Sequence, residues 1–294
     1  VSTLLAIGAL TAMSATTALA VETYRRPMDV VFGVARLLLK AQGTHEATCE
    51  AGDLPMRYLH AGRRGDPVVL IHGLGAAAAA WVTLIPMLSR EFQVYAPDMP
   101  GFGCTPLAPG KQCITTHVAY LRHFLDTLGY SQVTLVGQSL GGWIATRYAA
   151  EHPTRVKRLY LLNSAGLMRE GMFSPYAPDR DSARTYVQRM LSYHGPVPTF
   201  LLDAIVKASR EPAYAEFIAN YDRAEEVDEI LAQISAPTTI VWGTEDRIFP
   251  LCCAYDFQAG IPNSRLVLAP GVSHNSHVGA AKKIAQMMLE DAGR

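Results

Sequence analysis

Short apolar runs separated by helical stretches are the feature that most constrains how this chain folds. Two strand candidates joined by a turn, Ala47–Cys49 and Met56–His60, come first, and six apolar runs follow them without polar alternation. These runs are "VVLIH" from Val68, "VYAP" from Val94, "VTLV" from Val133, "RLYLLN" from Arg158, "TTIVW" from Thr238 and "RLVLAP" from Arg265. Unbroken apolar runs indicate strands covered on both faces, as in a parallel sheet.

Helical stretches alternate with these runs, and they are expected at Trp81–Arg90, Thr115–Leu128, Gly142–Glu151 and Ala280–Leu289. This alternation predicts a doubly wound α/β fold with a mostly parallel, eight-stranded sheet. Between residues 166 and 233 helical pieces such as "PTFLLDAIVKA" replace the strands. A connection of this length is usually functional, so it predicts a helical cap, or lid, inserted after strand six. The alternative is an ordinary packing excursion. The core would then comprise residues 45–165 and 234–294.

The N-terminal segment favours export. Residues 1–20, "VSTLLAIGALTAMSATTALA", carry no charge and end in the small-residue pattern that signal peptidases cleave. The alternative is an uncleaved membrane anchor, because about 20 apolar residues span a bilayer and Arg25 and Arg26 flank this run. Cleavage predicts a periplasmic or secreted protein, and the alternative predicts an exported protein that stays anchored in the membrane through this segment. Residues 21–44, which include "MDVVFGVARLLLK", predict an amphipathic helix that packs on the body or touches a membrane.

Charge and cysteine usage limit the partners. The 26 basic residues balance the 26 acidic ones, so no strong field is available to capture nucleic acid, and a small neutral substrate is expected. The cysteine spacing does not resemble a zinc site, and no metal or organic cofactor is expected. Cys104 and Cys113 flank a turn-rich loop that could close a disulfide, although five unpaired thiols fit the sequence equally well.

A single serine stands between glycines where a strand gives way to a helix. The motif G-Q-S-L-G runs from Gly137 through Gln138 to Gly141, in the strand-turn-helix context of a nucleophile elbow. Side chains in place of Gly137 or Gly141 would collide with neighbouring backbone, so glycine is needed there. The turn would hold the Ser139 hydroxyl above the sheet edge, at a helix start that favours negative charge.

A serine hydroxyl becomes a useful nucleophile only when a base removes its proton and a carboxylate orients that base. In this fold the order along the chain is serine, acid, histidine. His274 follows the last strand and is the predicted base, with His277 as the alternative. Asp246, in the turn after "TTIVW", is the predicted acid. Glu245 and Asp256 are the less suitable carboxylates beside it.

Backbone N–H groups should stabilise the oxyanion that forms during acyl transfer. We expect one from Leu140, directly after the serine, and one from Leu74 in the "HGLG" loop. His72 would brace this loop through hydrogen bonds, and Gly73 would give it room.

Together these motifs resemble the α/β-hydrolase superfamily, and the similarity extends from about Met56 to the C-terminus. The motifs are "HGLG", "DMPGFG", "GQSLGG" and "GTEDRIFP", followed by a late "SH". Within the superfamily the chain most resembles bacterial lipases and esterases similar to monoacylglycerol lipase. The resemblance implies a triad of Ser139, Asp246 and His274, with Leu74 and Leu140 forming the oxyanion hole. Two departures are Ser273, where the family often has glycine, and Cys104, where it usually has serine.

The expected activity is hydrolysis of hydrophobic carboxylic esters through an acyl-enzyme intermediate. Alternatives on the same fold are carbon–carbon bond hydrolysis, amide hydrolysis and acyl transfer. A non-catalytic ligand-binding protein is the alternative from another class. Association with a membrane or lipid surface is compatible with each of these.

Overall fold

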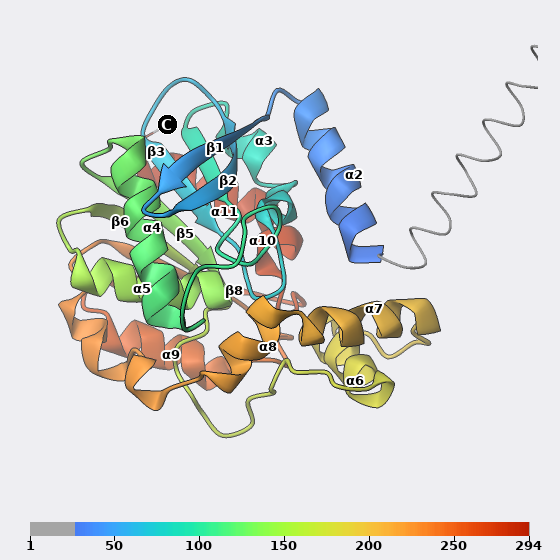
Figure 1. Cartoon of the computed structure of the whole chain (residues 1–294). Helices are drawn as coiled ribbons and strands as arrows, with labels where there is room; N and C mark the ends of the chain where they lie inside the picture. The colour runs from blue at the N-terminus through green and yellow to red at the C-terminus, as the bar shows by residue number, and fades with distance from the viewer. Residues whose placement is uncertain (1–26, 294) are drawn as a thin grey trace, which may run out of the picture.

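The computed structural model describes residues 27–293, and a single mixed sheet forms its centre (Figure 1). The order of the eight strands is β1-β2-β4-β3-β5-β6-β7-β8. They are β1 (His45–Ala51), β2 (Leu54–Ala61), β3 (Pro67–Ile71), β4 (Gln93–Pro97), β5 (Val133–Gln138), β6 (Val156–Leu162), β7 (Thr238–Gly243) and β8 (Ser264–Ala269). The β1–β2 and β2–β4 pairs are antiparallel, and all other neighbours are parallel. The predicted mostly parallel, eight-stranded α/β sheet is confirmed.

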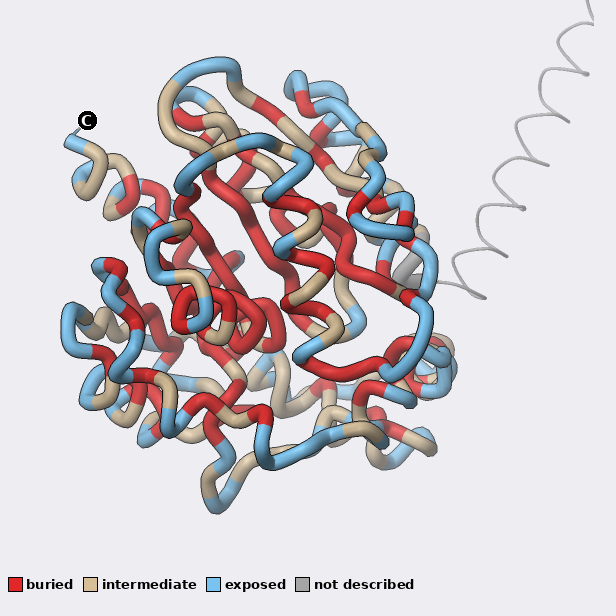
Figure 2. Tube along the Cα trace, turned by 60° about the vertical axis from the view of Figure 1, so that its left-hand side comes forward, coloured by how far each residue is buried: buried red, intermediate tan, exposed pale blue. Residues whose placement is uncertain are grey.

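Helices cover both faces of this sheet, so the central strands are buried on each side (Figure 2). Every residue of β5 and of β7 is buried, which is why these segments read as unbroken apolar runs. One core joins the sheet to α4 (Ile114–Leu128), α5 (Leu140–Glu151) and α9 (Leu251–Gly260). The other joins it to α2 (Pro27–Ala41), α3 (Ile85–Leu88) and α11 (Ala281–Asp291). Two short elements lie on the same side of the sheet: η1 (Ala78–Trp81), which precedes α3 in the chain, and α10 (Ser276–Gly279), which precedes α11.

The segment from residue 166 to 233, between β6 and β7, is helical and lies at the lower edge of the view in Figure 1. It contains α6 (Arg180–Leu191), α7 (Thr199–Arg210), α8 (Pro212–Ala219), η2 (Arg223–Glu225) and η3 (Asp228–Gln233). Ala177, Ala183 and Leu202 form a small core of its own. We refer to residues 166–233 as the cap segment.

One expectation about local structure was wrong. The continuous helix expected over Trp81–Arg90 is instead η1, a turn and the single-turn helix α3. Pro86 stands in the first turn of α3. Proline fits there because the N–H groups of the first turn have no partner inside the helix. Further along a helix it would remove a hydrogen bond and clash with the preceding turn, so α3 cannot begin a turn earlier and run through Pro86. Of the two alternatives for Cys104 and Cys113, the structure has the unpaired one: both are free thiols, with Cys104 exposed on its loop and Cys113 buried just before α4.

Among the described residues, 27–293, no helix has the length and apolarity needed to cross a bilayer. The expected signal peptide or anchor, residues 1–20, lies outside the described part of the chain.

Candidate active site

Ser139 occupies a strained turn between β5 and α5. Its backbone has φ 54° and ψ −119°, a combination that non-glycine residues adopt rarely and mostly at functional sites. A Cβ at Gly137 would lie 2.3 Å from the Gly141 carbonyl oxygen, and one at Gly141 would lie 2.0 Å from the Ile71 carbonyl oxygen. Because both contacts are with backbone, only glycine fits at either position. Ser139 is half-buried, and it stands directly before the first turn of α5.

The Asp246 carboxylate, in the turn after β7, is almost completely buried and accepts four hydrogen bonds. Its Oδ1 accepts from the backbone N–H groups of Ile248 at 2.8 Å and Phe249 at 3.0 Å. Its Oδ2 accepts from Asn163 Nδ2 at 2.6 Å and from His274 Nδ1 at 2.9 Å. Burial alone would raise the pKa of Asp246, but the charge and hydrogen bonds of these partners hold it below its ordinary value.

Because ionised Asp246 can only accept hydrogen bonds, the proton of neutral His274 lies on Nδ1. Nε2 of His274 therefore carries the free lone pair. The His274 ring is buried, with its edge against Phe249 at 5.1 Å between ring centroids. Glu245 donates its N–H to the Val272 carbonyl at 2.9 Å, which ties the Asp246 turn to the loop that carries His274.

The histidine loop also meets the serine turn. Gln138, the residue before Ser139, donates its side-chain Nε2 to the His274 carbonyl at 3.5 Å. A Cβ at Gly73 would lie 2.4 Å from Gln138 Oε1 and 3.2 Å from Ser139 Cβ. Three loops that are distant in sequence, those of Gly73, Ser139 and His274, thus converge at the carboxyl ends of β3, β5 and β8, where open α/β sheets bind ligands.

The other titratable candidates point elsewhere. His277, on α10, is buried with its ring 5.2 Å from that of Trp81, and it does not contact Asp246. Glu245 is exposed. Asp256 accepts from Arg169 Nε at 2.6 Å, on the outer side of α9. Of these groups, the structure pairs only Asp246 with His274.

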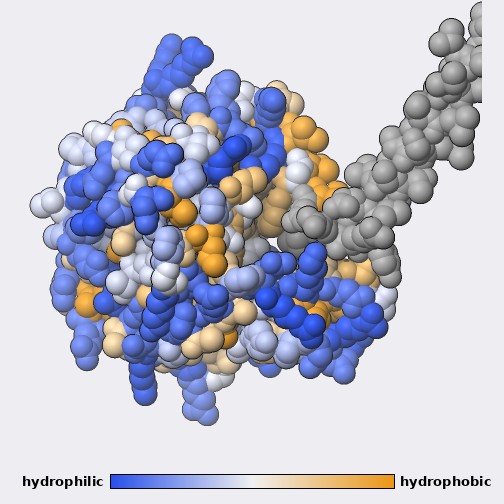
Figure 3. All heavy atoms as spheres, viewed as in Figure 1, coloured by the Kyte–Doolittle hydropathy of each residue, from blue (hydrophilic) through white to orange (hydrophobic). Residues whose placement is uncertain are grey.

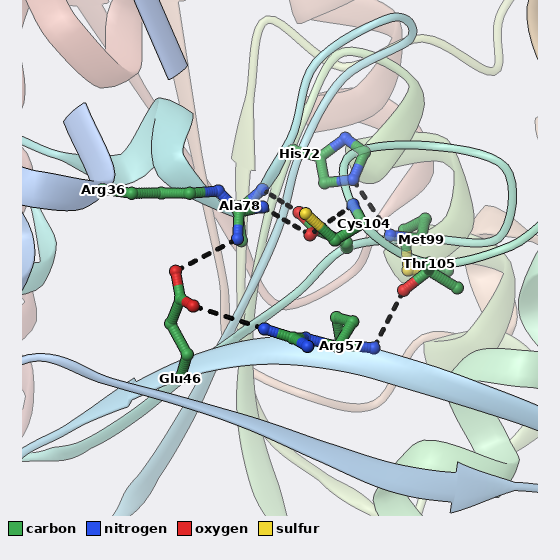
Figure 4. Close-up of polar contacts among 9 residues, drawn as sticks. Arg36, Glu46, Arg57, His72, Ala78, Met99, Cys104 and Thr105 are labelled. Carbon is green, nitrogen blue, oxygen red and sulfur yellow. Dashed lines mark hydrogen bonds and ion pairs between the residues drawn. The ribbon is translucent and has the colours of Figure 1, made fainter. Parts of the chain in front are cut away.

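The "HGLG" loop is braced from behind by His72 (Figure 4). His72 Nδ1–H donates to the Gly73 carbonyl at 2.8 Å, and its Nε2 accepts the Met99 N–H at 3.0 Å. Burial lowers the pKa of His72, which keeps the ring in the neutral form that this pattern requires. Leu74, two residues after His72, is half-buried. Leu140 is the first residue of α5, so its N–H is one of the four N-terminal donors that have no partner within the helix.

Asp98 links this loop to the N-terminal helix, a role that the sequence analysis missed. Its Oδ1 accepts the Ala78 N–H at 2.7 Å, and its Oδ2 accepts from the Cys104 N–H at 2.9 Å and from Arg36 at 2.6 Å. Figure 4 shows three partners of this carboxylate, Arg36, Ala78 and Cys104. Asn163 was also missed. The signal for both was a polar residue at the carboxyl end of a buried strand.

The cap segment packs against the HGLG loop, residues 72–75, and the turn of Asp246. The ring of Tyr214, on α8, lies against Gly75, where a Cβ would be 2.9 Å from it. Phe173 donates its backbone N–H to the Ile248 carbonyl at 3.1 Å. A second feature of this region is a hollow of about 500 Å³ whose lining includes Arg189, His194 and Arg247 beside Asp246. In the described part of the chain, no group of three or more His, Cys, Asp or Glu side chains is placed to hold a metal ion.

Comparison with known proteins agrees with this architecture. Residues 66–193 match the model of the alpha/beta hydrolase fold family. A 2-hydroxy-6-oxo-2,4-heptadienoate hydrolase from Pseudomonas putida strain F1 is 33% identical over 211 residues, which cover 66% of this chain and 76% of that protein. The chain therefore belongs to the α/β-hydrolase family, as the motifs indicated.

Two further relatives differ in the chemistry that their names describe. Monoacylglycerol lipase abhd6-A of Xenopus laevis is 24% identical over 279 residues, which cover 85% of this chain and 83% of the lipase. A solved structure of a membrane phospholipase A, described as a bacterial virulence factor, has the same fold with a TM-score of 0.79 at 23% identity and covers 99% of both chains. The chain is thus similar in sequence both to a protein named as an oxo-dienoate hydrolase and to one named as a monoacylglycerol lipase.

Proposed function

We propose that this chain is a serine hydrolase that cleaves hydrophobic carboxylic esters, with Ser139 as nucleophile, His274 as base and Asp246 as the group that orients His274. The observation that carries the proposal is the Asp246–His274 pair, 2.9 Å apart, on a loop that touches the strained turn of Ser139. This is the combination of nucleophile, base and orienting acid that acyl transfer requires.

In the proposed reaction Nε2 of His274 takes the proton of the Ser139 hydroxyl while Oγ attacks the ester carbonyl carbon. The N–H groups of Leu74 and Leu140 hold the negative oxygen of the tetrahedral intermediate. His274 then protonates the leaving alcohol, and the acyl group remains on Ser139. Water, deprotonated by His274, attacks the acyl-enzyme and releases the acid. Asp246 stabilises the imidazolium in both steps.

The uncharged side chains beside the HGLG loop favour a substrate with an apolar acyl group. Tyr214 faces Gly75 of the HGLG loop, and Ala213 lies where a Cβ at Gly101, in the separate Asp98–Gly103 loop, would be 2.4 Å away, so uncharged side chains of α8 contact both loops. Burial raises the pKa of Tyr214 well above its ordinary value and that of Tyr186 to about 12, so both phenols stay neutral. An ester substrate carries no charge to be neutralised, which suits this surface. The uncharged segment 1–20 supports a periplasmic or secreted site of action.

A second candidate is hydrolysis of a carbon–carbon bond in an oxo-dienoate, the substrate class that the names of several relatives describe. Such a substrate is a carboxylate and needs a cationic partner. The hollow beside Asp246 offers one, because Arg247 and Arg189 both line it and Arg247 donates to His194 Nε2 at 3.1 Å. We favour the ester because this hollow lies at the Asp246 turn and not at Ser139.

The test is to assay the purified chain with p-nitrophenyl butyrate and with 2-hydroxy-6-oxohepta-2,4-dienoate. We expect the ester to be hydrolysed faster, and Ser139→Ala to lower its kcat/KM on the order of 10⁴-fold or more, with loss of fluorophosphonate labelling. Ser131→Ala, an exposed serine away from the site, is the matched control. Faster turnover of the dienoate would select the second candidate. Full activity of Ser139→Ala on both compounds would overturn both.

A further inference from the structure

Helix α2 is apolar on two sides, but only one side is packed. Ala35 and Leu39 are buried against the body, and Phe32 packs partly into the same core. On the other side Val31 is 55% exposed, Val34 50%, Leu37 68% and Leu38 52%. We call these four residues the α2 patch. A surface helix of a soluble domain normally places polar residues on its outer side, so this arrangement requires an explanation.

The α2 patch is held outward by firm contacts on the opposite side of the helix. Arg36 pairs with buried Asp98 at 2.6 Å and with Glu46 at 3.3 Å. The backbone of Thr44, just after the helix, donates to the Leu39 carbonyl at 3.0 Å. Rotating the helix to bury the patch would therefore expose Leu39 and break the Arg36–Asp98 pair. Figure 3 shows hydrophobic residues gathered on the molecular surface over α2.

The length of α2 suits a position in the plane of a membrane surface and not a crossing of the membrane. It has 15 residues, which span about 22 Å, whereas the hydrocarbon core of a bilayer is about 30 Å thick. Lys40 is exposed at the end of the helix, whereas Arg36 is directed to the body in its pair with Asp98. A short helix with one apolar outer side and basic residues lies in the plane of a membrane surface, with its apolar side in the acyl region and its charges toward the head groups.

The chain before α2 indicates what covers the patch. Residues 1–20 contain no Asp, Glu, Lys or Arg, and only six residues separate them from α2, so an apolar segment of bilayer length leads directly to the patch. Arg25 and Arg26 in this connection, and Lys40 at the end of α2, suit anionic head groups. We propose that the α2 patch lies on a lipid bilayer, parallel to its surface, and holds the catalytic body against it. This proposal does not depend on catalytic turnover.

The test is depth-dependent fluorescence quenching on the full-length chain. The three native tryptophans are buried, so they give a constant background. Tryptophan is placed in the patch by Leu38→Trp and, in a second variant, by Leu37→Trp. The control is Tyr255→Trp on α9, a position that is also 50% exposed. Each protein is mixed with vesicles of phosphatidylcholine and phosphatidylglycerol whose acyl chains carry bromine.

We expect brominated vesicles to remove most of the emission added by the patch variants and none of that added by Tyr255→Trp. Unquenched emission at positions 37 and 38 would overturn the proposal, even if the protein sediments with the vesicles, because residues 1–26 alone would then make the contact. Unquenched emission together with a dimer in light scattering would overturn it in favour of a second copy on the patch.

Discussion

Close contacts with main-chain atoms require glycine at position 141. A Cβ there would lie 2.0 Å from the Ile71 carbonyl oxygen and 2.7 Å from the His72 carbonyl oxygen. These two residues cannot move away from the Cβ without displacing the HGLG loop. We expect Gly141→Ala to lower the free energy of unfolding by at least about 3 kcal/mol, as overpacked cores do. Gly33→Ala on α2, where nothing lies within 4 Å, should instead add about 0.5–1 kcal/mol through helix propensity. Urea denaturation of both variants measures the difference, and equal effects would contradict the contact argument.

Asn163 is hydrogen-bonded to Asp246, so we expect it to act through Asp246 and not on a substrate. It donates to Asp246 Oδ2 at 2.6 Å and accepts the Gly243 N–H at 3.3 Å, with a backbone φ of 45° that asparagine and aspartate tolerate. Asn163→Asp keeps the shape but sets a second negative charge beside Asp246, which raises the pKa of Asp246. Ionised Asp246 is then less favoured, and it orients His274 less well. We expect kcat/KM on the ester to fall by about tenfold or more at pH 7, since a change of one unit in the pKa of Asp246 corresponds to about 1.4 kcal/mol, which is tenfold in rate.

The loss in Asn163→Asp should deepen as the pH falls, since protonated Asp246 can no longer accept from His274. Asn220→Asp, on the cap segment, is the control and should keep the wild-type pH profile. An Asn163→Asp profile parallel to that of the wild type would show that the residue has only a structural role.

At the scale of elements, the buried ion pair between Arg36 and Asp98 joins α2 to the body. Asp98 is almost completely buried, so loss of its cation leaves a carboxylate with only the Ala78 and Cys104 N–H groups. Arg36→Met keeps the apolar stem and removes the charge. We expect it to lower the free energy of unfolding by about 3 kcal/mol and to speed amide exchange in α2. Arg184→Met, which breaks an exposed pair with Asp181, should cost less than about 1 kcal/mol. Equal losses would refute the role of the buried pair.

The whole molecule should lose stability in mild acid because it buries neutral imidazoles. Burial lowers the pKa of His117 to about 4 and, with the neighbouring His274, that of His277 to about 3. In the unfolded chain both imidazoles titrate near pH 6.5. Below that pH the unfolded state binds more protons than the folded state, so the free energy of unfolding decreases as the pH is lowered. The loss should reach about 2 kcal/mol per imidazole between pH 7.5 and 5. Asp246, whose pKa is lowered, adds its own loss only below about pH 4.

Urea midpoints at pH 7.5 and 5 measure this effect. His117→Gln and His277→Gln should each flatten the dependence of stability on pH, whereas His45→Gln, on the exposed edge strand β1, should leave the slope unchanged. An unchanged slope in all three variants would mean that other groups take up the protons.

Local pattern predicted much of the fold. Of the polar contacts between residues distant in the chain, that of Asp246 with His274 was predicted, whereas those of Asp98 and Asn163 were not. A strand covered on both faces must be apolar at every position, so β5 and β7 could be recognised from short windows. The helix expected over Trp81–Arg90 failed because one proline outweighed a favourable composition. The glycines of the elbow could be interpreted because their constraint is local, between a strand and the helix that follows it.

The sequence by itself determined the α/β-hydrolase family and the strand-helix alternation, since both depend on residues close together in the chain. Only the tertiary structure decided that Arg36 meets Asp98, 62 positions away, and that Asn163 meets Asp246, 83 positions away. It also decided which apolar side of α2 is packed. The physical reason is that such contacts depend on the order of strands in the sheet and on desolvation in the assembled core, neither of which a run of neighbouring residues specifies.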